Sequence, residues 1–283
     1  YTGNHDVGFM MFTSYGNGYR LTGNPAYKDV LLTSARSLST RFNPTVGCIM
    51  SWNPNSRWKF PVIVDNMMNL ELLFWAARNG GGEDLRKIAE THALTTMKNH
   101  VRPDGSTFHV IDYDPATGAV RARNTAQGYQ DGSAWSRGQA WGLYGFAMTY
   151  RETKNPIFLE TARKIADYYI AHLPADSVPY WDFQAPNIPD EPRDSSAAAI
   201  AASGLLELSG FVDDGAVAKK YRTTAVSILK SLTQPPYLTV GTRTSAILAH
   251  ATGAKPNNSE VDVSLIYGDY YFMEALLRLK RGM

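Results

Sequence analysis

Several apolar stretches of this sequence begin with, or close to, a polar residue of a type that can do chemistry. Asp6 precedes one such stretch, and Asp65 lies near the start of another. Two carboxylates can divide acid–base work when one lies in apolar surroundings and keeps its proton while the other stays ionised. Arg137 and Gln139 open a third stretch, and Asp194 opens a fourth. Two carboxylates, a cation and neighbouring aromatic rings would suit an anionic sugar.

Each of these residues also has a structural interpretation. An aspartate at a helix start is favoured by capping and by the helix dipole, so Asp6 and Asp65 could both be caps. Asp194 is interpreted as a cap, and His109, on an alternating stretch, is as readily a structural histidine. Arg137 is harder to explain in this way. A cation at a helix start opposes the dipole, so it requires a bound carboxylate or a buried partner.

The stretch that holds Asp65 runs over residues 60–79 and is predicted to be one helix. Its residues after Asp65 are mostly apolar, and a helix that is apolar on nearly every side is buried on nearly every side. Three glycines from Gly80 end it. Residues 83–101 carry apolar side chains on one face only, which indicates an amphipathic helix.

A repeat of such helix pairs underlies the chain. Residues 19–25, YRLTGNP, match residues 150–156, YRETKNP, and an amphipathic helix is predicted after each. Alternating buried and half-buried helices predict an array with an inner and an outer ring. A short β-hairpin is expected near residues 107–125, because TFHVIDY alternates like a strand and DPATG is typical of a turn. Further helices are predicted at residues 26–42, 133–152, 157–172, 194–211, 216–232 and 264–280, with a short one at 245–251.

The expected fold class is therefore all-α, as a single domain of helical hairpins over residues 1–283. A closed ring of six pairs would need about three more helices, so the chain is expected to be incomplete at its N-terminus.

Composition narrows the possible functions. The chain has 283 residues, is 44% hydrophobic and carries a formal net charge of +2, which provides no strong field for nucleic acid or a membrane. Its single cysteine, Cys48, excludes an internal disulfide and a cysteine-based metal site. The histidines are not spaced as metal ligands, and the glycine motifs of phosphate and dinucleotide sites are absent. Neither a metal nor a cofactor is expected.

Five segments together resemble a known family: HDVGFMMFTSYGNGYRLTGN, VDNMMNLELLFWAA, GYQDGSAWSRGQAWGLYGF, YWDF with RDSSAAAIAASGLLEL, and LIYGDYYFMEALLR. Over residues 4–279 the chain is similar to the unsaturated glucuronyl hydrolases, glycoside hydrolase family 88. The resemblance implies an (α/α)6 toroid. It also implies an enzyme that removes the unsaturated uronic acid left at a non-reducing end by polysaccharide lyases. The reaction would hydrate the C4=C5 double bond instead of attacking the anomeric carbon.

The resemblance also implies roles for individual residues. The aspartate of the DNMMN motif is Asp65, which would donate a proton to C4 and then take one from the water that adds at C5. Asp6, from the HDVGF segment, would assist it. Arg137 or Gln127 is expected to meet the substrate carboxylate, because of their charge and hydrogen-bond donors. The residues expected to line the sugar subsite are Trp52, His109, Gln127, Arg137 and Trp141.

Other interpretations stay open. Trp141, taken alone, is as well explained by core packing. The enzyme could be an unsaturated rhamnogalacturonyl hydrolase with a different pocket, or an epimerase or lyase on the same scaffold. A non-catalytic carbohydrate-binding toroid is a further alternative. The expected partner is an unsaturated uronyl oligosaccharide. The expected location is the periplasm, because the lyases that supply such substrates often lie outside the cytoplasm, and the cytoplasm is the alternative.

Overall fold

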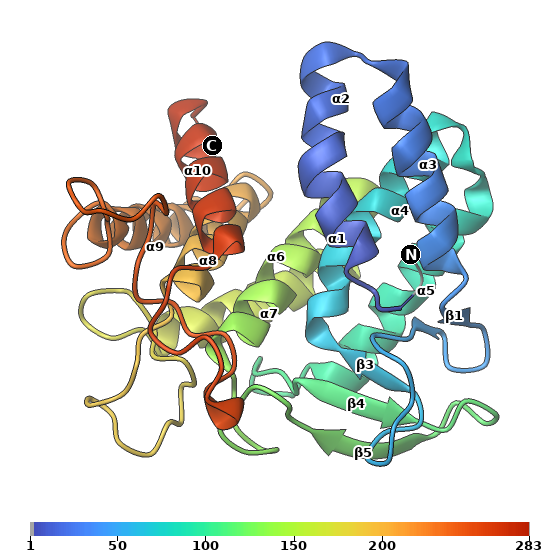
Figure 1. Cartoon of the computed structure of the whole chain (residues 1–283), viewed down its shortest axis with the longest axis horizontal. Helices are drawn as coiled ribbons and strands as arrows, with labels where there is room; N and C mark the ends of the chain where they lie inside the picture. Colours follow the sequence, from blue (N-terminus) through green and yellow to red (C-terminus); the bar gives the residue numbers. More distant parts are fainter. Residues whose placement is uncertain (1–2, 283) are drawn as a thin grey trace. The chain divides into compact units, whose positions relative to one another are not determined.

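The computed structural model describes residues 3–282, and the chain divides into two compact units. The first contains the described residues up to His100, with Val110–Arg123 and Met148–Lys154; the second contains Val101–His109, Asn124–Ala147 and the described residues from Asn155. Helices dominate both units (Figure 1).

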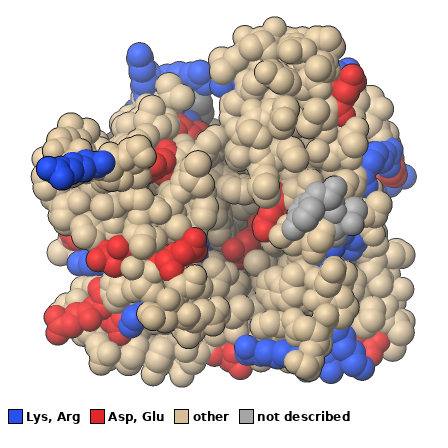
Figure 2. Space-filling model, viewed as in Figure 1, with Lys and Arg blue, Asp and Glu red and all other residues tan. Residues whose placement is uncertain are grey.

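None of the helices in residues 3–282 has the length and apolar character that a membrane crossing requires. On the face shown in Figure 2, acidic and basic side chains are interspersed, as the weak net charge leads one to expect.

The first unit combines helices with short strands. Its elements are α1 (Val7–Met11), a π-helical turn (Phe12–Gly16), α2 (Asn17–Thr22), α3 (Pro25–Ser39), β1 (Phe42–Asn43), β2 (Cys48–Ile49), β3 (Pro61–Ile63), a 3-10 turn (Val64–Asn69), α4 (Leu70–Ala76), a second π-helical turn (Ala77–Gly81), α5 (Glu83–His100), β4 (Val110–Tyr113) and β5 (Val120–Asn124). Apolar side chains at helical spacing face inward, as Leu31, Ala35 and Leu38 do on α3.

The predicted helix over residues 60–79 is wrong in its first part. Residues 61–63 form β3, which runs antiparallel to β4 with Val62 opposite Ile111. β-branched residues in this run favour an extended backbone, and all three positions are buried. The helical part starts only at Val64, with the 3-10 segment, and Asp65 is the second residue of that segment. In α4, five of the seven positions are buried, which agrees with the predicted buried helix.

The hairpin predicted near residues 107–125 is confirmed as β4 and β5. The strand order is β3-β4-β5, so the hairpin gains a third strand from the misassigned segment. The neighbouring stretch from residue 43 to 59 also contains β2, paired antiparallel with β1.

The second unit is organised around one buried helix. Its elements are the part of α6 (Ser136–Thr153) up to Ala147, α7 (Pro156–Ala171), α8 (Ser195–Ser209), α9 (Gly215–Leu232), a 3-10 turn (Lys255–Asn257) and α10 (Ile266–Lys280). α8 is buried on every side from Ser195 to Leu208 and packs against α9 and α10.

The short helix predicted at residues 245–251 is wrong. That stretch is an irregular loop with isolated bridges at Leu248 and Ala251, and His250 has a φ of 61°, which an α-helix does not allow.

Helix starts follow the sequence closely. Asn24 accepts a hydrogen bond from Ala26 N at 3.0 Å, and Asn155 accepts one from Ile157 N at 3.2 Å. In both helices a proline takes the first helical position, so the repeated Asn-Pro pair is a repeated cap. The predicted cap at Asp194 is confirmed, because its side chain accepts from two backbone N–H groups of α8.

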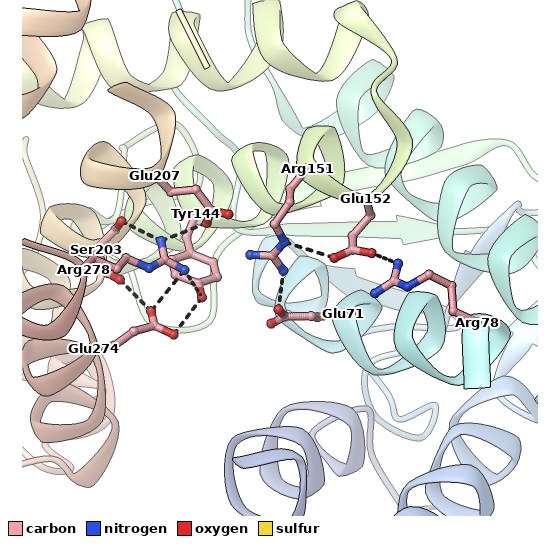
Figure 3. A network of polar contacts seen from close by, with 9 residues as sticks. All are labelled: Glu71, Arg78, Tyr144, Arg151, Glu152, Ser203, Glu207, Glu274 and Arg278. Carbon is pink, nitrogen blue, oxygen red and sulfur yellow. Dashed lines mark hydrogen bonds and ion pairs between the residues drawn. The ribbon is translucent and has the colours of Figure 1, made fainter. Parts of the chain in front are cut away.

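Arg278 joins three helices of the second unit (Figure 3). Its Nη1 donates to Ser203 O and to Glu207 Oε2, both at 2.8 Å, and its Nη2 donates to Tyr144 Oη at 3.1 Å. Glu274 Oε2 lies 3.5 Å from Nη2 and accepts from the Ser203 hydroxyl at 2.6 Å. Arg278 is buried, so its charge is balanced inside the unit by these carboxylates.

Replacing Arg278 by methionine should therefore lower the free energy of unfolding by about 3–5 kcal/mol, because two carboxylates lose their cation in a buried setting. Urea denaturation measures this. Lys280→Met, on the exposed end of the same helix, should change stability by no more than about 0.5 kcal/mol. Equal midpoints for the two variants would contradict the prediction.

Candidate active site

Asp65 lies on a firmly held turn of the first unit. On one side of it, Ile63 N donates to Ser51 Oγ at 2.9 Å. On the other side, Asn66 Nδ2 donates to Ile49 O at 2.7 Å. The sequence neighbours of Asp65 are buried, whereas Asp65 itself is half-buried. The backbone on both sides of Asp65 is therefore fixed in place, and one oxygen of its carboxyl group, Oδ2, is buried.

Asp6 stands at the N-cap position of α1, but its side chain makes no capping hydrogen bond. Instead, its Oδ1 lies 3.2 Å from Nε2 of His5, whose side chain is 4% exposed against 50% for Asp6. Partial burial raises the pKa of Asp6, but the hydrogen bond and charge of His5 outweigh burial and bring this pKa below its usual 3.8. Asp6 is thus an ionised carboxylate at neutral pH.

The helix that begins after Asp6 packs against the turn that holds Asp65. Phe9 N donates to Asn69 Oδ1 at 2.7 Å. Gly8 allows this close approach, because a Cβ there would lie only 2.7 Å from Cβ of Asn69. The two candidate catalytic residues, far apart in sequence, therefore sit on two contacting elements of one unit.

Trp52 lies beside the same segment. It forms an antiparallel bridge with Asn4, and His5 N donates to Ser51 O at 2.9 Å. Its ring meets that of Trp58 edge to face, with centroids 5.2 Å apart, and it is half-buried. The first unit thus brings together the segments of Asp6, Asp65 and an aromatic side chain.

In the second unit, His109 is buried and its Nδ1 is an acceptor. Two backbone donors point at this atom, Ala126 N at 3.2 Å and Gln127 N at 3.3 Å. A ring nitrogen that accepts cannot carry the proton, so this network assigns the hydrogen of a neutral His109 to Nε2. The ring lies against Trp135, with centroids 4.5 Å apart. The N–H group of neutral His109 therefore lies at Nε2, a buried atom.

Gln127 and Trp141 occupy different settings in this unit. Gln127 Nε2 donates to Gly253 O at 3.1 Å. Trp141 is 6% exposed and packs against Tyr271 and Tyr267, at centroid distances of 5.5 and 6.0 Å. The aromatic cluster agrees with the core interpretation of Trp141, and its contact with sugar stays a prediction.

Arg137 has a buried partner, one of the two explanations that its place at a helix start allows. Its Nη1 donates to Asp194 Oδ2 at 2.7 Å, with side chains 2% and 0% exposed. The guanidinium carbon also lies 4.5 Å from the ring centroid of Trp135. Asp194, predicted only as a cap, is thus both a cap and the counter-ion of Arg137.

Comparisons with known proteins identify the relatives. No protein-family model matches the chain. It is 48% identical, over 279 residues, to an unsaturated glucuronyl hydrolase of Formosa agariphila, a match that covers 97% of this chain and 69% of the relative. It is 36% identical to an unsaturated glucuronyl hydrolase of a Bacillus species, over 99% of this chain and 75% of the relative. The chain belongs to the unsaturated glucuronyl hydrolase family.

A solved structure supports this membership. An unsaturated glucuronyl hydrolase specific for heparin superposes with a TM-score of 0.96 and 48% identity, over 99% of this chain and 76% of that chain. The predicted fold class is confirmed: an α/α toroid fold with a small antiparallel sheet. The prediction of a glycosidase is confirmed by membership of the unsaturated glucuronyl hydrolase family. The single domain over residues 1–283 stays a prediction.

Other solved unsaturated glucuronyl hydrolases show oligosaccharide binding. A Streptococcus agalactiae enzyme, 31% identical with a TM-score of 0.84, is an aspartate-to-asparagine variant complexed with dGlcA-GalNAc6S. A second variant of that enzyme has another aspartate replaced, about 60 positions earlier along its chain. Asp6 and Asp65 are separated by nearly the same length of sequence.

Sequence reasoning did not single out two polar residues of the motif segments, Asp182 and His5. Asp182 is fully buried, and its Oδ2 accepts from Tyr129 N at 2.9 Å and from Ser133 Oγ at 2.7 Å. Burial raises the pKa of Asp182, although these hydrogen bonds favour its ionised form. His5, beside Asp6, was also missed. The motif segments include both residues, but only a fold shows what they contact.

Among residues 3–282, no group of three or more His, Cys, Asp or Glu side chains could hold a metal ion.

Proposed function

We propose that this glycosidase removes 4,5-unsaturated glucuronic acid from the non-reducing end of oligosaccharides that polysaccharide lyases produce. The observation that carries the proposal is the placement of Asp65 and Asp6 on contacting elements, with His5 favouring the ionised form of Asp6. The spacing of the aspartates replaced in solved relatives supports the same pair.

Asp65 supplies the proton in this reaction. Its carboxyl group adds a proton to C4 of the enol ether, water adds at C5, and the carboxylate takes a proton from that water. The resulting C5 hemiketal opens, and the sugar at C1 then leaves with its hydroxyl restored. One water is consumed, and the products are the leaving sugar and a 4-deoxy-5-keto uronic acid.

The surroundings favour a protonated Asp65. A carboxyl group that donates to carbon must hold its proton at the working pH. Met67 and Met68 are buried beside it, and the ionised Asp6 is on the adjacent element. Low polarity and a like charge both disfavour the ionised form of Asp65. Each effect can exceed that of the helix dipole, which favours the ionised form by about 1 kcal/mol.

The remaining candidate residues are assigned to substrate binding, each within its own unit. Trp52 offers a half-buried ring on which a sugar can stack, and the neutral His109 carries its hydrogen on Nε2. Gln127, Arg137 and Trp141 belong to the same proposed set in the second unit.

The test is a turnover assay on four unsaturated disaccharides, from chondroitin, heparin, hyaluronan and rhamnogalacturonan. Hydration removes the ultraviolet absorbance of the enol ether. We expect loss of absorbance on at least one of the three glycosaminoglycan substrates. Loss on the pectic substrate alone would indicate a rhamnogalacturonyl hydrolase instead. Binding of all four without turnover would indicate a non-catalytic toroid.

A further inference from the structure

Three polar residues on the buried face of α5 have side-chain atoms without a hydrogen-bond partner. His92, Thr96 and His100 follow one another at intervals of four residues, so they share one face of the helix, and each is 0% exposed. Within residues 3–282, no group forms a hydrogen bond with Nε2 of His92, Oγ1 of Thr96 or Nδ1 of His100. Buried polar atoms rarely lack a partner, because losing their hydrogen bonds to solvent is costly. A row of three therefore indicates a bound ligand.

The second ring nitrogen of each histidine shows where its hydrogen lies. Nδ1 of His92 accepts from Ile49 N at 3.0 Å, so the hydrogen of neutral His92 is on Nε2, which is a donor. Nε2 of His100 lies 3.0 Å from Val62 O, which can only accept, so Nε2 donates and Nδ1 is an acceptor. Burial lowers the pKa of His92 to about 3 and that of His100 to about 4, so both rings are neutral near pH 7. The row thus contains a donor, a hydroxyl group and an acceptor.

Water fits these three atoms better than an ion does. A water molecule can accept from Nε2–H of His92 and donate to Nδ1 of His100, and the Thr96 hydroxyl can do either. Internal waters typically make about three hydrogen bonds of this kind. An anion would leave Nδ1 without a donor, and a cation would face the Nε2–H group. Neighbouring groups do not replace the water: the Thr96 carbonyl near the His100 ring is itself an acceptor, and the Cys48 thiol beside Thr96 is a weak one.

The two histidines also anchor the strands on either side of the Asp65 turn. His92 holds Ile49 N, and Ile49 O in turn accepts from Asn66 Nδ2 at 2.7 Å. His100 bonds to β3, which leads directly into the 3-10 segment that contains Asp65. α5 itself packs against that segment. The state of the two rings therefore affects the backbone before and after the candidate proton donor.

We propose that His92, Thr96 and His100 bind one internal water molecule and that, together with this water, they position the turn of Asp65. The water keeps each ring in the tautomer that bonds to its strand. The opposite tautomer would set a donor against a donor at His92, or an acceptor against an acceptor at His100. All three are positioning residues, buried away from the substrate. The inference rests on the proposed function for its kinetic readout, whereas the water site does not depend on the substrate.

Nuclear magnetic resonance of the wild-type protein with isotope-labelled histidine tests the water site directly. The chain has six histidines, so their ring signals can be assigned one by one. Near pH 7, His92 and His100 should both carry their hydrogen on Nε2, and Nε2–H of His92 should show a nuclear Overhauser contact with water. A hydrogen on Nδ1 of either ring, or an Nε2–H of His92 without a water contact, would overturn the proposal.

Two variants of Thr96 separate the effect of its hydroxyl from that of its shape. Thr96→Val keeps the shape and removes a ligand of the water, whereas Thr96→Ser keeps the hydroxyl and removes a methyl group. We expect Thr96→Val to lower kcat by about tenfold and to change KM little, because a small displacement of a catalytic group slows the chemical step. Thr96→Ser should retain most of the wild-type kcat. Thr91→Val, the same change at an exposed position of α5, is the matched control and should keep the wild-type kcat.

Two kinetic results would contradict the positioning role. If Thr96→Val keeps the wild-type kcat, the hydroxyl and its water do not position Asp65. If Thr96→Ser is as slow as Thr96→Val, the side chain acts through packing and not through its hydroxyl. The wild-type spectrum still decides the matter should Thr96→Val fail to fold. A wild-type enzyme without turnover on any of the four disaccharides would refute the proposed function alone, and the spectrum would still show whether the water is bound.

Discussion

Asp65→Asn is expected to lower kcat on an unsaturated glucuronyl disaccharide by about 10³-fold, within the range that general acid–base catalysis contributes. Asparagine keeps the size and most hydrogen bonds of the side chain, but it has no proton to give to C4. Substrate binding should survive, so KM should change by less than tenfold. The absorbance assay measures both constants.

The control for this variant is Asp29→Asn, on the exposed face of α3 in the same unit. It should keep the turnover of the wild type. The turnover of Asp6→Asn should fall between those of Asp65→Asn and Asp29→Asn, because this variant loses the neighbouring charge and keeps the proton donor. Turnover by Asp65→Asn within tenfold of the wild type would refute the assignment of Asp65 as the proton donor.

Local sequence signals predict the starts of helices well in this chain. Asn24 with Pro25, and Asn155 with Pro156, each supply a cap and a first helical residue whose effect needs no distant partner. Asp194 caps α8 for the same reason. The segment before Asp65 shows the limit. Residues 61–63 are apolar in either a helix or a buried strand, and only their pairing with β4 selects the strand.

Candidate site residues are predictable by type, whereas their partners are not. The position of Arg137 predicts that it needs an anion, but the anion is Asp194, 57 residues further along. His109 is predicted as a polar residue on a strand, and its tautomer follows only from the backbone of residues 126 and 127. Such contacts depend on how the chain folds back on itself, which no local pattern contains.

The second large effect expected is a loss of stability in mild acid, caused by two buried histidines of the first unit. Both lie on α5 and are 0% exposed. His92 Nδ1 accepts from Ile49 N at 3.0 Å, and burial, aided by His100 and His5, lowers its pKa to about 3. His100 Nε2 lies 3.0 Å from Val62 O, and burial, with the charge of Arg123, lowers its pKa to about 4.

The sign of the pH dependence follows from these depressed values. Below pH 6.5 the unfolded chain takes up protons at both histidines, while the folded chain does so only below about pH 4. Folding is therefore most favoured above pH 6.5 and loses free energy as the pH falls towards 4. Between pH 7 and pH 5 each histidine should lower the free energy of unfolding by about 2 kcal/mol, so the pair should lower it by about 4 kcal/mol. Urea midpoints at the two pH values measure the loss.

His100→Gln separates this effect from other acid-sensitive groups. Glutamine can keep a donor towards Val62 O, so the variant should fold, with lower stability at pH 7. Its loss of stability between pH 7 and pH 5 should be about half that of the wild type, because only His92 still resists protonation. His172→Gln, at an exposed position after α7, should leave the wild-type pH dependence intact. If all three proteins lose the same free energy between these pH values, acid sensitivity does not come from the buried histidines. Asp182 could not supply that loss, because a carboxyl pKa raised by burial favours folding as the pH falls.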